Sequence, residues 1–375
     1  MKERQSKEFR AALLAWFAQS QRDLPWRHWR DPYRIWISEI MLQQTRVATV
    51  IPYYRRFLER FPTVGELAAA PEEEVLRMWS GLGYYRRARN LQIAARQIVA
   101  GHGGEFPRHR AEVLELAGIG EYTAAAILSI AFGERLAVLD GNVARVLARL
   151  DARRGDLREA GRWRSLQHRA DELLDGEAAG DWNQAMMELG ATLCTPGSPQ
   201  CLLCPVRQFC EAHKLGIAGQ LPEKRPKRAE VAVRLAAAVL VDKSGNSLLL
   251  PPPASSQPRP ADDPVPALVA KLWHFPTAAA DGEGIRALRQ LFAKQLKMTG
   301  EKAVFEPLST VRHTVTYRRI EVSPFLVRVS KLPRTGGSRT IALNAVLDEP
   351  ISNLTRKVAR AALAKVGADS SPEGG

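Results

Sequence analysis

Glu39 is the first residue whose type and position suggest chemistry. It lies in the segment 33–45, an otherwise strongly apolar predicted helix in which Gln43 and Gln44 follow four and five residues later. A carboxylate in such surroundings is costly to bury unless it is paired. Burial would raise its pKa, so the group could still hold a proton near neutral pH, as a general acid must. The alternative is a structural N-cap or a buried, hydrogen-bonded acid.

The stretch 116–143 combines a glycine turn with a second carboxylate. Gly118 and Gly120 can take positive φ and precede a predicted helix over 122–132, whose first N–H groups could point outward and bind a phosphate. Asp140 follows Gly120 by twenty residues, just before the apolar spacing of another helix. A glycine C-cap, a buried helical hairpin and an N-cap aspartate would explain the same pattern without a ligand.

All four cysteines lie close together in the sequence, in the order Cys194-x6-Cys201-x2-Cys204-x5-Cys210. This crowding favours a metal site over a disulfide framework. Four thiolates so close together bind zinc or an iron–sulfur cluster. Zinc sites usually pair two close cysteine knuckles, whereas only one close pair is present here, so the spacing favours the cluster.

Length and charge set the broad class of the protein. The chain has 375 residues and a formal net charge of +14. Its length is enough for two domains, and its charge favours a polyanionic partner. No apolar run approaches the roughly 18 residues needed to cross a membrane, and the charged, amphipathic start has no signal-peptide pattern. We therefore expect a soluble protein of a reducing compartment.

Helical spacing dominates the sequence up to about residue 216. Besides the segments above, helices are predicted over 7–19, 46–60, 71–79, 84–101 and 109–117. The segment 81–90 adds a glycine turn, two aromatic residues and three arginines. It is either a solvated basic helix face or a surface where arginines contact phosphates and an aromatic side chain lies near the bases.

The pattern changes to alternation after a basic linker over 218–230. Alternating apolar residues from Val231 and a turn at 244–246 predict a hairpin, and the proline-rich stretch 251–266 predicts an exposed loop. The other predicted elements are a helix over 284–296, strands over 302–312 and 315–330, and a helix over 353–365. The sequence thus predicts an all-α domain followed by an α+β domain over 231–366, with a disordered tail over 367–375.

Together, these segments resemble the MutY family of adenine DNA glycosylases, which belong to the endonuclease III-like helix-hairpin-helix enzymes. The resemblance covers almost all of residues 8–225 and rests on 24–27 (LPWR), 38–45 (SEIMLQQT), 81–90, 116–120, 139–143 (LDGNV), 183–190 (NQAMMELG) and the cysteine pattern, which matches a 4Fe–4S loop. It implies a catalytic domain over 1–217, with a six-helix module at about 28–133, a cluster module made of 1–27 and 134–217, and DNA between the two modules. A weaker resemblance of the second domain to MutT (Nudix) proteins rests on 271–276 (KLWHFP) and 312–314 (RHT).

The resemblance implies a glycosylase of base excision repair that flips adenine paired with 8-oxoguanine, or guanine, out of double-stranded DNA. Glu39 would protonate N7 of the adenine, and Asp140 would stabilise the oxocarbenium ion left on the sugar. Tyr122 and Asn142 would orient Asp140 and the attacking water. The other implied site residues are Trp26, Arg27 and Leu42 in the adenine pocket, Gln43, Gln44, Thr45 and Tyr84 where the base leaves the helix, and Gly118, Gly120 and Arg86 at phosphates.

Position 122 distinguishes two subclasses of the family fold. Relatives that also cut the DNA strand carry a lysine just after the hairpin turn, and its amine forms a Schiff base with the sugar. This chain has Tyr122 there. We therefore expect base removal without a β-lyase step.

The C-terminal domain departs from the family pattern in two places. The stretch 281–287 offers too few glutamates to bind magnesium as a Nudix hydrolase does, so no pyrophosphatase activity is expected. MutY proteins read 8-oxoguanine with a Phe-Ser-His turn, where this chain has Val315, Thr316 and Tyr317. We expect Thr316 and Tyr317 to contact the lesion; a plain hairpin with Val315 packed inward is the alternative.

Two other functions compete with adenine removal. A thymine or uracil mismatch glycosylase can share Tyr122 and the cluster, but Glu39 and the second domain favour adenine. A non-catalytic DNA-binding iron–sulfur protein would have no use for Glu39 and Asp140. A 4Fe–4S cluster that orders the loop for DNA contact, for example through Arg207, is favoured over one with a redox role. We further expect a cytoplasmic monomer, associated with the bacterial nucleoid when on DNA and not with a membrane.

Overall fold

The computed structural model describes residues 3–223, 229–251, 272–280, 283–298, 303–315 and 317–369. The chain divides into two compact units. The first consists of Met1–Met78 and Tyr84–Pro226, and the second of Trp79–Gly83 and Lys227–Gly375. No helix within the described residues is both long enough and apolar enough to cross a membrane.

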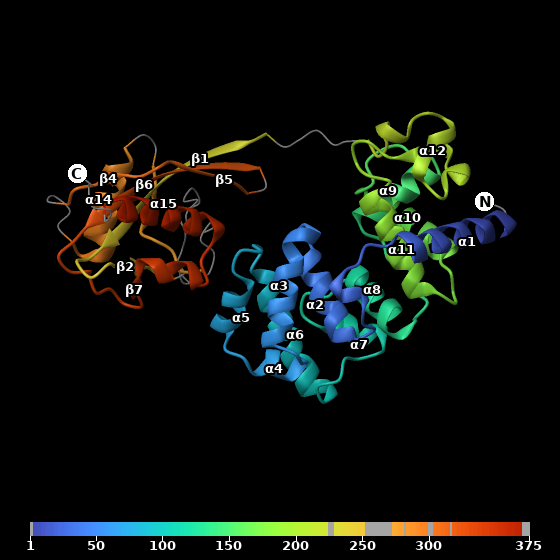
Figure 1. Cartoon of the computed structure of the whole chain (residues 1–375), viewed down its shortest axis with the longest axis horizontal. Helices are drawn as coiled ribbons and strands as arrows, with labels where there is room; N and C mark the ends of the chain where they lie inside the picture. Colours follow the sequence, from blue (N-terminus) through green and yellow to red (C-terminus); the bar gives the residue numbers. More distant parts are fainter. Residues whose placement is uncertain are drawn as a thin grey trace, which may run out of the picture. The chain divides into compact units, whose positions relative to one another are not determined.

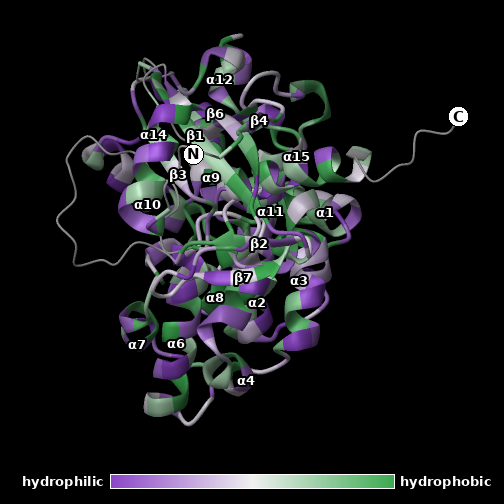
Figure 2. Cartoon of the chain, turned by 90° about the vertical axis from the view of Figure 1, so that its left-hand side faces the viewer, coloured by the Kyte–Doolittle hydropathy of each residue, from purple (hydrophilic) through white to green (hydrophobic). Residues whose placement is uncertain are grey.

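The first unit is all-α, as predicted from the helical spacing (Figure 1). Its helices are α1 (Glu3–Ser20), α2 (Pro32–Leu42), α3 (Val47–Arg60), α4 (Val64–Ala69), α5 (Glu72–Trp79), α6 (Arg86–His102), α7 (Arg110–Glu115), α8 (Glu121–Phe132), α9 (Gly141–Leu150), α10 (Ala160–Leu173), α11 (Ala179–Thr192) and α12 (Glu211–Lys214). Figure 2 shows hydrophilic and hydrophobic stretches alternating along α3, whose buried side chains are Val50, Tyr54 and Phe57. Such amphipathic spacing is what lets a helix cover a core with one face.

Helix α1 returns to the later helices of the unit. Phe9, Leu13 and Phe17 of α1 pack in one core with residues of α9, α10 and α11. The ring of Phe9 meets that of Trp182 edge to face, with 5.6 Å between their centroids. Figure 1 shows α1 beside α9–α11, apart from the lobe that contains α2–α7. The beginning of the chain therefore packs against α9, which Asp140 caps, and against α10 and α11.

Helices α7 and α8 form a hairpin around the predicted glycine turn. Gly118 has φ +80°, and a Cβ there would lie 2.7 Å from Cβ of Asn90. Both the left-handed backbone and the close approach require glycine. Gly120 instead has extended backbone, with φ −111°. The expected positive φ is therefore found at Gly118 and not at Gly120.

The second unit is built on a seven-stranded sheet. Its strands are β1 (Val231–Val241), β2 (Asn246–Leu249), β3 (Thr277–Ala279), β4 (Glu306–Pro307), β5 (Val311–Val315), β6 (Arg318–Arg328) and β7 (Arg339–Ala342). The order is β4-β6-β1-β2-β7, with β3 paired to β1 and β5 paired to β6. β1 and β6 run parallel in the centre, and the other pairs are antiparallel.

Helices cover both faces of this sheet. Helix α15 (Asn353–Asp369) packs against the face of Val233, Leu235 and Ala237. Helix α14 (Gly284–Leu291), continued by a π-helical turn over Phe292–Leu296, packs against the face of Ala236, Ala238 and Leu240. Alternation along β1 therefore sends its side chains into two cores. This is the α+β layout that the sequence predicts.

Three sequence predictions of element boundaries need correction. The strand expected over 302–312 is broken, because the register shifts by one residue between the pairs Pro307↔Phe325 and Val311↔Val322. Helix α15 continues to Asp369, so the tail does not begin at 367; one glycine costs a helix only about 1 kcal/mol. The linker predicted from 218 begins later, because Ala218 and Leu221 are buried in the first unit.

Asn183 joins α11 to the chain between α8 and α9. Its buried amide donates to Ser129 Oγ and the carbonyl of Leu136, both at 2.8 Å, and accepts from Val138 N–H at 3.1 Å. Asn183→Ala should lower the free energy of unfolding by about 2–4 kcal/mol, because it strands buried backbone groups. Urea denaturation measures this, with the exposed Arg4→Ala as control. A decrease in the free energy of unfolding no larger than that of Arg4→Ala would show that the buried hydrogen bonds of Asn183 do not stabilise the fold.

Candidate active site

Glu39 lies on the buried face of α2, with 6% of its surface exposed. The hydroxyl of Tyr122, on α8, donates a 2.6 Å hydrogen bond to its Oε2. Burial raises the pKa of Glu39 to about 7; the Tyr122 hydrogen bond and the charge of Arg27 oppose this rise, and the charge of Asp140 adds to it. The carboxyl group can therefore hold a proton near neutral pH, as its sequence surroundings predicted.

The hydroxyl of Tyr122 hydrogen-bonds to Glu39, whereas the sequence analysis predicted that Tyr122 orients Asp140. Besides the bond to Glu39, its hydroxyl lies 3.2 Å from the sulfur of Met187. Burial and the two nearby carboxylates raise the pKa of the Tyr122 phenol well above its ordinary value. The hydroxyl therefore remains a donor to Glu39.

Asp140 is the N-cap of α9, which confirms its predicted place at a helix N-terminus. Its Oδ1 accepts the N–H groups of Asn142 at 2.9 Å and Val143 at 2.7 Å. Its Oδ2 accepts from Nδ2 of Asn142 at 2.9 Å. Burial raises the pKa of Asp140 above its ordinary value, although these hydrogen bonds and the charge of Arg145 oppose the rise. Asn142 thus donates a hydrogen bond to each oxygen of Asp140.

A buried arginine supports this cap from behind. Arg145 donates from Nη2 to Oδ1 of Asn142 at 2.9 Å and to the carbonyl of Gly190 at 2.7 Å. Its Nε donates to the carbonyl of Cys194 at 2.8 Å. A Cβ at Gly190 would lie 2.7 Å from Cβ of Asn142, so only glycine lets α11 approach the cap this closely. Arg145 and Gly190 were not singled out from the sequence as site residues.

Glu39 and Asp140 line the same cavity, which has a volume of about 1570 Å³ with its open mouth included. The structure brings ten of the predicted site residues to its wall. They are Trp26, Arg27, Glu39, Leu42, Gln43, Gln44, Thr45, Tyr122, Asp140 and Asn142. Residues from four separate segments of the chain therefore meet at one place.

Glu188 also lines this cavity and was missed as a site residue. It is 1% exposed, and it accepts from Arg22 at 2.7 Å and from Arg27 at 2.8 Å. Burial alone would raise the pKa of Glu188, but the two arginines outweigh it and hold the pKa at about 2. The argument applied to Glu39, a carboxylate among apolar residues, would have found it in the segment 183–190.

The turn after α2 is held by Arg87, another residue without a predicted role of its own. Its Nη1 donates to the carbonyls of Ile40, Met41 and Gln43 at 2.8, 2.9 and 2.6 Å. These are end groups of α2 that the helix itself leaves unsatisfied. Burial lowers the pKa of Arg87 to about 10. Within this turn Gln44 has the left-handed φ of 56°, which directs it out of the helical path.

Two predicted residues of the segment 81–90 lie outside the cavity lining. Tyr84 is 50% exposed, with φ 48°, and the guanidinium of Arg87 lies 5.5 Å from its ring centroid. Arg86 is exposed at the first position of α6. Both are surface residues of the first unit.

The N-terminus of α8 is open to solvent. In the part of the chain that the structure describes, no side chain caps this terminus, and a Cβ at Gly120 would meet no heavy atom within 4 Å. The first N–H groups of the helix and the positive end of its dipole therefore face outward, an arrangement that suits an anion.

The four cysteines surround a cavity of their own. Cys194, Cys201, Cys204 and Cys210 are free thiols that line it together with Arg149 and Arg207. Arg149 donates from Nη1 to the sulfur of Cys194 at 3.2 Å. Burial raises the pKa of Cys204 to about 12. Among the described residues, no three His, Cys, Asp or Glu side chains are arranged to hold a single metal ion.

The family profile of HhH-GPD superfamily base excision DNA repair proteins matches residues 37–167. A solved thermostable thymine-DNA glycosylase is 31% identical, with a TM-score of 0.52, and the match covers 56% of this chain and 98% of that one. The chain belongs to the HhH-GPD superfamily. The profile match contains both Glu39 and Asp140 and the hairpin between them.

Two further members of this superfamily are similar to the chain. The human adenine DNA glycosylase is 50% identical over 216 residues, which are 55% of this chain. The chain spans only 39% of the length of that enzyme. A solved endonuclease III, in a non-covalent complex with DNA, is 25% identical with a TM-score of 0.50 and covers 58% of this chain and 99% of its own.

Tyr317, one of the two predicted lesion contacts, lies in the second unit, directly before β6. Val315 pairs with Arg318, and Val315 packs against the core on the α15 side of the sheet. The inward packing that was the alternative for Val315 is therefore present. Tyr317 accepts a hydrogen bond from Val231 N–H through its carbonyl, at 2.9 Å. Thr316 lies outside the described residues.

The raised pKa of Glu39 predicts how stability varies with pH. Its native pKa of about 7 exceeds the ordinary 4.5, so the native state binds more protons between these values. Stability contributed by the protonated carboxyl is therefore present below pH 4.5 and lost as the pH rises through 7. Glu39→Gln removes this loss. As the pH rises from 4.5 to 8, its free energy of unfolding should therefore gain about 2–4 kcal/mol relative to that of the parent.

Urea denaturation at several pH values measures this difference. The exposed Glu134→Gln serves as the matched surface control. A stability difference between Glu39→Gln and the parent that does not change with pH would show that Glu39 is not a buried, protonated acid.

Proposed function

We propose that the chain is a monofunctional adenine DNA glycosylase that removes adenine paired with 8-oxoguanine or guanine. The observation that carries this proposal is the pair of carboxyl groups in one cavity, one with a pKa of about 7 and one fixed by three hydrogen bonds. The human relative carries the name adenine DNA glycosylase. The name and the chemistry of the cavity support the same reaction.

Adenine is a poor leaving group until its ring is protonated. A flipped adenine in the cavity would receive a proton at N7 from Glu39. The hydroxyl of Tyr122 donates to Oε2 of Glu39, so it keeps the carboxyl group in place while the other oxygen stays available to the base. The proton lost from Glu39 leaves a carboxylate that Tyr122 and Arg27 stabilise.

Cleavage of the N-glycosidic bond leaves an oxocarbenium ion on the sugar. Asp140, at the start of α9, supplies the negative charge that stabilises this ion or briefly traps it, as carboxylates do in retaining glycoside hydrolysis. Its hydrogen bonds to Asn142 and Val143 are fixed before the reaction, so little reorganisation is needed when the charge forms. Water then replaces adenine at the sugar.

The cavity also offers groups that suit the edge of an adenine. Trp26 and Leu42 provide apolar walls, and Glu188 with Arg27 provides an acceptor beside a donor. An adenine presents the complementary pair, an amino group next to a ring nitrogen acceptor. The solved thymine-DNA glycosylase makes thymine or uracil the second candidate. A pyrimidine has no N7 to protonate, so the acid Glu39 favours adenine.

DNA would be held by groups at the surface of the first unit and by the turn beside the cavity. The open N-terminus of α8 and the exposed Arg86 are suited to phosphates, and the turn at Gln43, Gln44 and Thr45 is suited to the space left by the base. The solved endonuclease III is described in complex with DNA, which supports the same partner here. Thr316 and Tyr317 are proposed to contact the 8-oxoguanine, and Tyr84 is proposed to fill the DNA helix where the adenine leaves it.

The cysteine cavity fits a 4Fe–4S cluster. Its four thiols face one space, and the guanidinium of Arg149 donates to the sulfur of Cys194, which would stabilise a thiolate ligand. Cys194, Cys201, Cys204 and Cys210 would each bind one iron. The cluster would order the loop 194–210; the reaction at the adenine uses the protein's own carboxyl groups.

Release of adenine from a duplex with adenine opposite 8-oxoguanine, revealed by alkali, tests the function. Glu39→Gln should lower the single-turnover rate by about 10²–10⁴-fold, because it cannot donate a proton. Asp140→Asn should lower it by about 10²–10³-fold while keeping the helix cap. Glu134→Gln is the matched surface control. A faster release of thymine or uracil from mismatches, or full activity of either variant, would refute the proposal.

Tyr122 predicts that the strand stays intact after base removal. A phenol cannot form a Schiff base with the sugar, so borohydride should trap no covalent complex and nicking should require alkali. Tyr122→Lys is the informative comparison, since it restores an amine at this position. Efficient borohydride trapping of the parent protein would contradict a monofunctional mechanism.

Metal analysis of the purified chain tests the cluster. We expect about four irons and four sulfides per chain. Cys204→Ser should lose the cluster and lower the thermal unfolding temperature of the protein. Ser198→Ala, in the same loop, should keep the cluster. Stoichiometric zinc in place of iron would overturn the assignment.

A further inference from the structure

Two surface turns of the first unit have left-handed backbone at residues that are not glycine. Gln44, in the turn after α2, has φ 56°, and Tyr84, two residues before α6, has φ 48°. Gln44 lines the cavity of Glu39 and Asp140, and Tyr84 is 50% exposed. A side chain in this region of φ is strained unless its surroundings fix it, and such strain is concentrated at functional sites. Both turns therefore need a partner that holds them in this conformation.

The guanidinium of Arg87 contacts both turns. Its Nη1 donates to the carbonyl of Gln43 at 2.6 Å, and its Nη2 donates to Oγ1 of Thr45 at 3.2 Å. These are the two neighbours of Gln44 in the chain. On its other side, the guanidinium lies 5.5 Å from the ring centroid of Tyr84, within the range of a cation–π contact. One side chain thus ties the turn at Gln44 to the turn at Tyr84.

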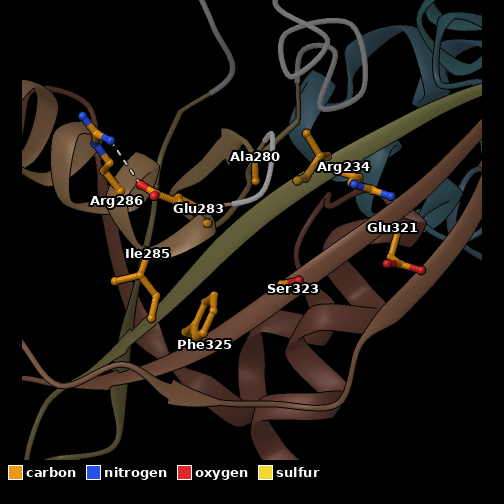
Figure 3. Close-up of a pocket in the computed structure, with 10 residues that line it drawn as sticks. Arg234, Ala280, Glu283, Ile285, Arg286, Glu321, Ser323 and Phe325 are labelled. Atoms are coloured by element: carbon orange, nitrogen blue, oxygen red, sulfur yellow. Dashed lines mark hydrogen bonds and ion pairs between the residues drawn. The ribbon is translucent and has the colours of Figure 1, made fainter.

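These contacts differ from those of an arginine at the protein surface. Figure 3 shows a surface arginine in the second unit, at a cavity on the α14 face of the sheet. There Arg286 pairs with Glu283 at 3.2 Å, and the two side chains are 73% and 70% exposed. Water competes for a pair of this kind, so the pair fixes little. Arg87 is instead partly buried and binds backbone carbonyls, and its planar guanidinium presents several donors in fixed directions.

We propose that Arg87 is a positioning residue for base flipping. It holds the turn at Gln44 and the ring of Tyr84 at a fixed spacing, so that both enter the space left by the adenine as one rigid wedge. Extruding a base costs unstacking energy, which groups that fill the gap offset. The inference rests on the proposed removal of adenine. Without Arg87 each turn relaxes from its left-handed conformation, whereas the carboxyl groups of Glu39 and Asp140 keep their own hydrogen bonds.

Base flipping can be measured apart from catalysis in the Glu39→Gln background. A duplex with 2-fluoroadenine as the target base, opposite 8-oxoguanine, should show a ¹⁹F resonance of the extruded base when bound, distinct from that of the stacked base. Adding Arg87→Met, which keeps apolar bulk but removes every donor, should return the signal to the stacked resonance. In the chain with Glu39 intact, Arg87→Met should lower the single-turnover rate of adenine release by about 10²-fold, the effect of a misplaced positioning group.

Arg96→Met is the matched control. Arg96 also lies on α6 and also donates to backbone carbonyls at the end of a helix, those of Ala68 and Ala70 at α4, at 3.1 and 3.5 Å. Its substitution should leave both the rate and the extruded resonance unchanged. Arg87→Lys keeps the charge but lacks the planar fork, so its losses should be smaller than those of Arg87→Met.

Thermal unfolding shows whether each variant is folded, and Arg87→Lys is used alone if Arg87→Met is not. A parent-like rate and a full extruded resonance in the folded Arg87 variant overturn the proposal, as do equal losses in Arg96→Met. A lower rate with the base still fully extruded also overturns it, because Arg87 would then act on catalysis and not on flipping. If the parent chain released no adenine, the proposed function would fail separately, and the ¹⁹F resonance would still test Arg87 because it requires no catalysis.

Discussion

Two carboxyl groups in one cavity of the first unit accept different numbers of hydrogen bonds, and this difference separates their pKa values. Glu39 receives one hydrogen bond, from Tyr122, whereas Asp140 receives three and caps a helix. Burial raises the pKa of both groups, and the donors around Asp140 oppose that rise more than the single hydrogen bond to Glu39 does. The pair can therefore exist as one acid and one anion at the same pH. Acid and base roles in other enzymes are separated in the same way.

This difference depends on residues that do not touch the cavity. Arg145 and Arg149 stand one turn apart on α9 and bind the carbonyl and the sulfur of Cys194. Arg145 also holds Asn142, which holds Asp140. The cysteine loop is thus connected to Asp140 by two side chains, those of Arg145 and Asn142. An ordered cysteine loop therefore holds Arg145 in position, and Arg145 in turn holds Asn142 against the N-cap Asp140.

The sequence could predict the parts of the site that follow from local pattern. A carboxylate within apolar spacing marked Glu39, and Asp140 before an apolar helix marked the cap. Partners across the fold could not be predicted in the same way. The bond of Tyr122 goes to Glu39, eighty-three residues away, and not to Asp140. Arg87 reaches the end of α2 because of how α6 packs, which no spacing within 81–90 reveals.

The same limit applies to the second unit. Alternating apolar residues from Val231 predicted β1, and the strand predicted over 315–330 contains the whole of β6. The strand prediction failed at 302–312, where a one-residue shift of register separates β4 from β5. Such a shift is decided by pairing with β6 and leaves no mark in the sequence of one strand. Resemblance to a family supplied the roles of Trp26, Arg27 and Leu42, which pattern alone did not.

Glu188 shows why the cavity is better explained by a ligand than by stability. A carboxylate that is 1% exposed and bound to two arginines gains little net stability, since the cost of removing the charges from water offsets their attraction. Apolar side chains of the same volume would serve the fold as well. The positive charge of Arg27, however, also lowers the pKa of Glu39. Through Arg27, the ion pair therefore influences the pKa of Glu39. At the same cavity wall it presents a carboxylate and a guanidinium to which a ligand can hydrogen-bond.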